Sequence, residues 1–320
     1  MTQTNSRFPV WAALLGSGLA GMLVAVQSRV NGGLSREIDN GFLAALVSFG
    51  SGLLIIGAVL LCTPSARRGL AQVTRTVRAG ELPVWGLLGG TCGGFFVLSQ
   101  GLVAPALGLA LFTVGIVAGQ VSGGLVMDRI GLGPGGRVDP TAARVIGTVL
   151  AVVAVAFTVW ADLRPGSPVW LVLVPIVAGL GMAWQSAVNG LVRSAARSAI
   201  TATFINFVTG TAMLGIAAAI SIAVRGWPTH WPSEPWFYIG GLIGTLFIAV
   251  AAVLVRTAGV LLLSMSNVAG QLIASVALEA GLPLANGVTP GLIAGAAVSL
   301  IAVAIAASGG GTGRAKRVEG

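Results

Sequence analysis

The chain has 320 residues, of which 55% are hydrophobic and only 8% are charged, whereas an ordinary soluble domain has about 25% charged residues. This composition excludes a soluble globule, because so much apolar surface must face lipid. The formal net charge of +9 does not indicate a nucleic-acid partner, since the basic residues lie in short links between apolar runs. The sequence therefore predicts an all-α membrane protein whose main surroundings are the lipid bilayer.

A membrane-spanning helix needs about 20 apolar residues, so the stretches without charges can be converted into spans in chain order. Most stretches hold one helix. The stretch from Glu81 to Asp128 is long enough for two, and Pro105 with Gly101 and Gly108 supplies the break. We expect ten transmembrane helices, at residues 9–29, 41–62, 84–103, 106–127, 143–161, 168–188, 200–223, 236–255, 258–279 and 289–308.

The distribution of Lys and Arg predicts the orientation. An even number of spans puts both termini on the same side, and 14 Lys and Arg residues fall on that side against 4 on the other. Because cytoplasmic links carry the excess of positive charge, we expect a multi-pass protein with both termini in the cytoplasm. The four residues on the opposite side are Arg29, Arg36, Arg164 and Arg225.

The chain contains an internal repeat. At an offset of 158 residues, 8 of the 14 positions from Ala20 to Gly33 recur identically. At an offset of 151, an Ala-Gly-Gln motif and the acid eight residues later recur. A unit of five spans is odd, so the second unit must enter the bilayer from the opposite face. We expect two inverted five-helix repeats, at residues 1–164 and 165–310, and a basic cytoplasmic tail at 311–320.

Inverted repeats are typical of secondary transporters, because two related bundles around a central site can exchange which side is open. The alternative is that duplication produced only a larger helical bundle.

Six amide side chains inside the spans are paired by the repeat. In the first helix of each repeat, the two amides are four residues apart and therefore lie on the same helix face. They are candidates for lining a substrate cavity, and the alternative is that they form hydrogen bonds between helices. The six candidates are Gln27, Asn31, Gln120, Gln185, Asn189 and Gln271.

Two acids end repeat-related helices, Asp128 and Glu279. Inversion places one at each membrane face, so we expect them to act as gate or coupling residues; the alternative is two ordinary solvated helix ends. The candidate partners, assigned by predicted side, are Arg193 or Arg197 for Asp128 and Arg29 or Arg36 for Glu279.

The remaining motifs indicate packing rather than catalysis. Overlapping G-x-x-x-G pairs run through residues 86–94 and 115–123 and recur at 240–244 and 291–295, which favours close contact between helices. His230 is the sole histidine, and Cys62 and Cys92 lack metal-ligand spacing. We therefore expect no enzyme, no cofactor and no metal.

The motifs together resemble a known family. Leu19-Ala20-Gly21 leading to Gln27 and Asn31, then Phe49 and Gly52, and the Ala-Gly-Gln motif with its following acid are similar to the YdcZ-type branch of the drug/metabolite transporter superfamily. Members of that branch are typically half this length, so the chain resembles two fused units in the ten-helix layout of EamA-type transporters.

The resemblance implies a bacterial inner-membrane protein with a presumed role in moving small molecules. It also implies that Gln27, Asn31, Gln120, Asp128 and their repeat partners belong to the family pattern.

The sequence thus predicts a secondary transporter of a metabolite or drug-like molecule that works by alternating access and is driven by a proton or other solute gradient. The alternatives are a passive facilitator or lipid-carrier flippase, and a membrane scaffold that does not transport. The sequence also allows a homodimer.

Overall fold

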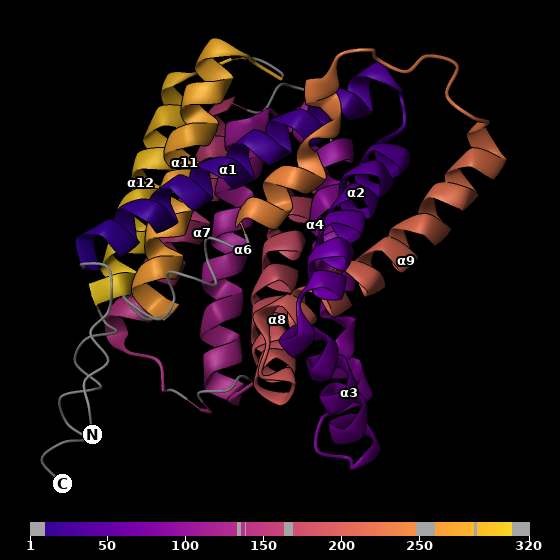
Figure 1. The fold of residues 1–320 in the computed structure, drawn as a ribbon. Helices are drawn as coiled ribbons and strands as arrows, with labels where there is room; N and C mark the ends of the chain where they lie inside the picture. Colours follow the sequence, from indigo (N-terminus) through magenta and orange to yellow (C-terminus); the bar gives the residue numbers. More distant parts are fainter. Residues whose placement is uncertain are drawn as a thin grey trace, which may run out of the picture.

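The structure is a computed structural model that describes residues 10–132, 136–137, 139–162, 169–247, 260–284 and 287–308. All regular secondary structure within these ranges is helical. The helices form a bundle in which α6 and α8 stand side by side near the middle (Figure 1). The predicted tail at 311–320 and the second part of the predicted span 236–255 lie outside the described residues.

The long helices of the first half follow the predicted order. The predicted span 41–62 coincides with α2, and α1 continues past its predicted end at 29. The predicted break at Pro105 is present as the short helix α5 (Ala104–Leu107), after which Gly108 takes a positive φ of 84° that favours glycine. The long helices are α1 (Val10–Glu37), α2 (Gly41–Cys62), α4 (Gly89–Leu102), α6 (Leu109–Ile130) and α7 (Ala142–Asp162).

The second half contains α8 (Leu173–Ala196), α9 (Ala199–Arg225), a helical segment over 240–247, α11 (Val260–Gly281) and α12 (Pro290–Ser308). Short 3₁₀ turns, η1 (Val84–Leu88), η2 (Val169–Val172) and η3 (Pro235–Tyr238), precede α4, α8 and the 240–247 segment. Four helices of the described part are long and apolar enough to cross a membrane, Gly41–Cys62, Leu109–Ile130, Trp170–Ala196 and Ala199–Arg225.

One helix was not predicted. The Arg-rich link after α2 folds into α3 (Pro64–Arg78), which projects at the lower end of the bundle in Figure 1. Its arginines are exposed, and its opposite face, with Ala66 and Val73, is buried. The hydroxyl of Thr201 on α9 donates to the Ala66 carbonyl at 2.8 Å. A search for apolar spans overlooks such an amphipathic surface helix, because only one of its faces is apolar.

The two halves of the chain meet at glycines. A β-carbon on Gly90 of α4 would overlap the carbonyl oxygen of Asn206, and one on Gly241 would overlap that of Ser48. Gly241 follows Gly90 by 151 residues and Asn206 follows Ser48 by 158, so the two contacts join positions that the sequence repeat relates. Backbone-to-backbone contact of this kind needs residues without side chains.

A phenylalanine pair lies at the same interface. The rings of Phe49 and Phe207, which are 158 residues apart, have centroids 4.8 Å apart. A β-carbon on Gly52 or Gly210 would overlap a ring atom of this pair. The aromatic pair therefore depends on glycines at two further repeat-related positions.

Repeat-related backbone geometry also precedes α2 and α9. Asp39 and Arg197 have positive φ angles of 49° and 51°, the only such non-glycine residues in the described ranges. Each comes directly before a helix N-cap, Asn40 or Ser198, whose side chain accepts a backbone N–H of the first turn. The same turn is thus built twice from different residues.

We expect the glycine contacts to carry much of the stability of the bundle. Gly90→Ala should lower the free energy of unfolding by about 1 to 3 kcal/mol, because the new methyl group meets backbone that cannot move aside. Gly215→Ala is the matched control on α9, since a β-carbon there meets nothing within 4 Å. Thermal unfolding of the detergent-solubilised protein measures both, and equal midpoints for the two variants would contradict the prediction.

Candidate functional site

Two of the predicted amides, Gln27 and Asn31, form a buried cluster on α1. Gln27 is 8% exposed and Asn31 is 1% exposed. Gln27 Nε2 donates to the carbonyl oxygen of Gly240 at 2.9 Å, and Asn31 Nδ2 donates to Gln100 Oε1 at 2.6 Å. Gln100 Nε2 in turn donates to Ser28 Oγ at 2.7 Å. We call these five residues the first amide cluster.

The repeat-related amides, Gln185 and Asn189, occupy the corresponding face of α8. Asn189 Oδ1 accepts a hydrogen bond from Asn206 Nδ2 at 3.1 Å. A β-carbon on Gly89 would lie 3.0 Å from Asn189 Oδ1, and one on Gly93 would lie 2.5 Å from Gln185 Oε1. We call Gln185, Asn189 and Asn206 the second amide cluster.

The two clusters have matching surroundings. Gln185 packs on Gly93, and Gln27 packs on Gly244, where a β-carbon would lie 2.7 Å from Gln27 Nε2. Gly244 follows Gly93 by 151 residues. Each amide-bearing helix face therefore lies against a G-x-x-x-G face of the other half of the chain. This contact explains why the amides and the glycines recur together in the sequence repeat.

Two buried polar atoms of these clusters, and one of the neighbouring Ser48, have unused hydrogen-bonding capacity. Asn31 Oδ1, Ser48 Oγ and Gln185 Oε1 have no hydrogen-bond partner in the described part of the chain. A β-carbon on Gly240 would overlap Asn31 Oδ1, and it would lie 2.6 Å from Ser48 Oγ, so these two atoms face the same glycine. An unpaired polar atom in a low-dielectric interior is costly, so such atoms are suited to bind a ligand or water.

Gln120 and Gln271 lie elsewhere. Gln271 Nε2 donates to Asn267 Oδ1 on its own helix at 2.7 Å. The backbone of Gln120 lies at the crossing of α6 and α8, where a β-carbon on Gly179 would approach Gln120 N to 2.8 Å. The hydrogen bonds of the two amide clusters do not include either glutamine, and their positions favour a role in packing.

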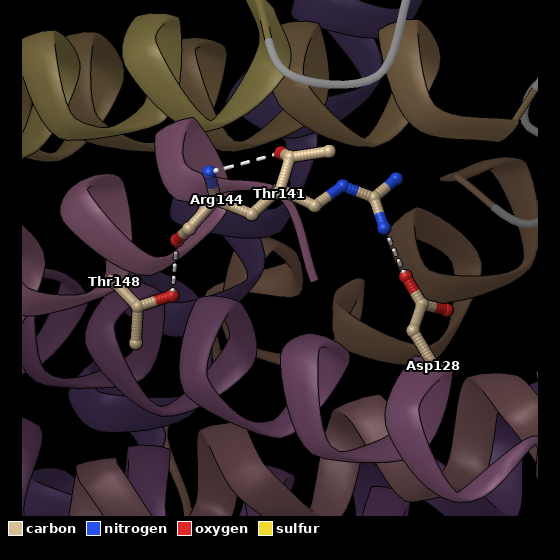
Figure 2. A network of polar contacts seen from close by, with 4 residues as sticks. All are labelled: Asp128, Thr141, Arg144 and Thr148. Atoms are coloured by element: carbon tan, nitrogen blue, oxygen red, sulfur yellow. Dashed lines mark hydrogen bonds and ion pairs between the residues drawn. The ribbon is translucent and has the colours of Figure 1, made fainter. Parts of the chain in front are cut away.

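Asp128 ends α6 in an ion pair with Arg144 of α7 (Figure 2). The Arg144 Nη1 to Asp128 Oδ2 distance is 2.7 Å, and the Asp128 side chain is 45% exposed. The expected partners Arg193 and Arg197 are therefore wrong. Arg144 was available in the sequence, but predicted sides alone could not show that the turn between α6 and α7 returns it to Asp128.

Glu279 occupies a different environment from its repeat partner. It is 1% exposed, and its Oε2 accepts the backbone N–H of Leu109 at 2.6 Å. Leu109 is the first residue of α6, where N–H groups lack partners within the helix. The alternative of a solvated helix end is therefore wrong for Glu279.

Arg29 and Arg36, the two expected partners of Glu279, contact the residues that follow it. Arg29 Nε donates to the carbonyl oxygen of Leu282 at 2.9 Å, and Arg36 Nη1 donates to that of Leu284 at 2.8 Å. Both guanidinium groups thus hold the chain that leaves α11, directly after Glu279.

Sequence reasoning missed several residues of the site. Ser48 and Asn206 could have been found, because they are polar residues at the same repeat position. Gln100 has Ala251 as its partner, so the repeat gives no signal for it. No three His, Cys, Asp or Glu side chains gather in the described ranges.

Comparison with known proteins gives a family match. The family model described as "Putative inner membrane exporter, YdcZ" matches twice, over residues 12–157 and 170–307. This result confirms the resemblance seen in the sequence and shows two units of the family in one chain. No curated protein matches. A solved structure described as "Crystal structure of protein" shares 19% identity over 92% of this chain and 96% of its own, with a TM-score of 0.53, which supports the fold alone.

The two acids should differ in their effect on stability. Glu279→Ala should cost about 2 kcal/mol, because it leaves the buried N–H of Leu109 without its charged acceptor. Asp128→Ala should cost no more than about 1 kcal/mol, since its ion pair is half exposed. Chemical unfolding in detergent measures the difference, and equal costs for both variants would contradict the environments described above.

Proposed function

The chain belongs to the YdcZ-type family of inner membrane exporters in the drug/metabolite transporter superfamily, and on this basis we propose that it is a secondary transporter of a small molecule. The observation that carries the proposal is the pair of amide clusters, which lie against glycines of the other half and which, with the neighbouring Ser48, hold three unpaired polar atoms. The substrate would bind between the clusters through hydrogen bonds.

The proposed architecture is ten spans in two inverted five-helix repeats, at residues 1–164 and 165–310. The repeat-related contacts support it: Gly90 meets Asn206 as Gly241 meets Ser48, and Phe49 packs on Phe207. A twofold relation between inverted units explains why each such contact has a counterpart. Alternating access then follows from the rocking of one unit against the other.

The chemistry of the clusters suggests a substrate that forms hydrogen bonds. Neither amide cluster contains an ionised side chain, and the amide nitrogens of Gln27, Asn31 and Gln100 all donate to protein oxygens. The unpaired atoms are two amide oxygens and one hydroxyl. A metabolite or drug-like molecule with N–H or O–H groups matches these free acceptors.

A second reading is that the amides only hold helices together, as in a scaffold. The first cluster offers some support, because most of its hydrogen bonds join protein groups. A passive facilitator or a lipid-carrier flippase would also use a polar cavity, and dependence on an imposed gradient separates these from a coupled transporter.

The proposed orientation has both termini in the cytoplasm. The excess of Arg and Lys on that side includes the exposed arginines of α3, which would lie at the lipid headgroups. Reporter fusions after Gly80 and after Gly320 should both give cytoplasmic signals, and one after Trp231 should give an external signal. An external signal at Gly80 would overturn both the orientation and the inversion.

The transport test uses proteoliposomes with an imposed pH gradient and a panel of labelled metabolites and drug-like compounds. For any compound that accumulates, Gln27→Ala and Gln185→Ala should each lower uptake severalfold. Their abundance in the membrane should stay within about twofold of the parent, because one interhelical hydrogen bond is worth only about 1 kcal/mol.

Gln72→Ala is the matched control, since Gln72 lies on α3, away from both clusters. If folded protein and uptake fall in step in the cluster variants, the amides serve packing and the scaffold reading is favoured. Uptake that is unchanged in both cluster variants would remove the amides from the substrate site.

A further inference from the structure

We propose that Glu279 is a proton-binding latch that holds the outer mouth of the transporter closed. The inference rests on the proposed function and orientation, which place the end of α11 at the outer face. It goes beyond a general gate, because it assigns the closure to one acid of the repeat-related pair and identifies the ligand that releases it as a proton from the outer solution.

The contacts of this end of the bundle converge on α11 and the residues that follow it. Glu279 binds the first N–H of α6, while Arg29 and Arg36 of α1 bind the carbonyl oxygens of Leu282 and Leu284. These three hydrogen bonds tie two helices of the first half to the second half. Together with the hydrogen bond from Ser221 to Asn40, they are among the contacts that must break if the halves separate at this end.

At the other end of the bundle, the hydrogen bond from Thr201 to the Ala66 carbonyl joins the halves, but the described residues form no charged link between them there. Ala187 and Ser194 stand at the repeat positions of Arg29 and Arg36. Asp128, the partner of Glu279, forms its ion pair with Arg144, within the first half of the chain. The sequence therefore provides a charged link between halves on the Glu279 side, whereas the described contacts of Asp128 provide none on the opposite side.

Burial of the repeat-related polar residues shows the same asymmetry. In five repeat-related pairs the member on the Glu279 side is buried and its counterpart on the Asp128 side is partly or fully exposed, whereas Ser48 and Asn206 are both buried. The structure is thus closed at the Glu279 end and more open at the other. The buried members and their counterparts are Gln27 with Gln185, Ser28 with Ser186, Asn31 with Asn189, Gln271 with Gln120, and Glu279 with Asp128.

The charges that face Glu279 are few. On α1, the charged residues at this end are Arg29 and Arg36, with Glu37 exposed at the helix terminus. Residues 95–127 and 266–308 contain no other ionisable group except Glu279 itself. The positive end of the α6 dipole adds a further attraction for a carboxylate. The group that binds the Glu279 carboxylate at this end is the first N–H of α6.

A small cavity lies against Glu279, and in the proposal it is the route by which a proton reaches the carboxylate. It is lined by Glu279, by Leu107 and Ala110 on the first-half side, and by Gly287 and Thr289 after α11. A proton from the outer solution that binds a Glu279 oxygen removes the negative charge, and no covalent bond other than the new O–H changes. The bond from Leu109 then loses its charge assistance, which is about half of its strength.

The test is the accessibility of the outer mouth, which needs no substrate. In a background with Cys62→Ser and Cys92→Ala, Ala110→Cys places a thiol at a buried position that lines the cavity. An impermeant maleimide is added to spheroplasts at external pH values from about 8 to about 3.5, a range that passes through the ordinary pKa of a glutamate side chain, about 4.3. Rates are normalised to those of the unfolded chain at each pH.

Labelling of the parent should be slow at high pH and about tenfold faster at low pH, because a charge-assisted bond has become a neutral one. Glu279→Gln should label rapidly at every pH. Asp128→Asn should keep the pH response of the parent. A parent rate that does not change with pH, or a Glu279→Gln rate as slow as the parent at high pH, would overturn the latch.

A second pair of variants keeps Glu279 and tests the N–H group of Leu109 that donates a hydrogen bond to it. Leu109→Pro deletes the N–H at the first helical position, where proline is tolerated, and Leu109→Ala is its control with the N–H retained. The proline variant should label faster than the alanine variant at high pH, and equal rates would count against the latch. A transporter without a latch would show the expected uptake but would not show the pH-dependent labelling. The labelling test can therefore overturn the latch without overturning the proposed transport function.

Discussion

Close backbone contact at glycines is the constraint on which the rest of the bundle depends. At Gly90, Gly241, Gly119 and Gly270, a single added carbon would overlap backbone atoms of the facing helix. In a bilayer, helices gain no hydrophobic free energy from leaving lipid for one another, so close packing and hydrogen bonds must hold them together. This requirement accounts for part of the high glycine content, 48 residues, since other glycines such as Gly215 meet nothing within 4 Å.

The same glycines create room for polar side chains. Gln27 fits against Gly244 and Gln185 against Gly93, because neither glycine has a side chain to fill the space. Amides in a low-dielectric interior must find partners or a ligand, and the first cluster satisfies most of its groups while leaving Asn31 Oδ1 free. Packing and binding therefore use the same helix faces, and a substitution at a glycine would disturb both.

Repeat-related residues need not have equal roles. Asp128 and Glu279 occupy the same place in the repeat, yet one forms a half-exposed ion pair and the other is a buried acceptor at a helix N-terminus. An alternating transporter must break this equivalence in any single state, because one end is closed while the other is open. The two repeats also differ in sequence at this end, because the residues that correspond to Arg29 and Arg36 of α1 are uncharged.

The sequence by itself determined the membrane class, the two fused units, the break near Pro105 and the four-residue spacing of the amides. Composition, identity between repeats and helix periodicity can all be read from the chain without knowing how its helices pack. A search for long apolar runs missed α3, because its buried or half-buried apolar residues, Ala66, Leu70, Val73 and Val77, occur about once per helical turn among polar ones. Only the tertiary structure decided that Asp128 pairs with Arg144, that Gln100 joins the first amide cluster and that Glu279 binds the start of α6. The ion pair of Asp128 depends on how two consecutive helices pack, and the other two contacts depend on how helices distant in sequence cross. Counting charges assigns a residue to a membrane face but does not identify its neighbour.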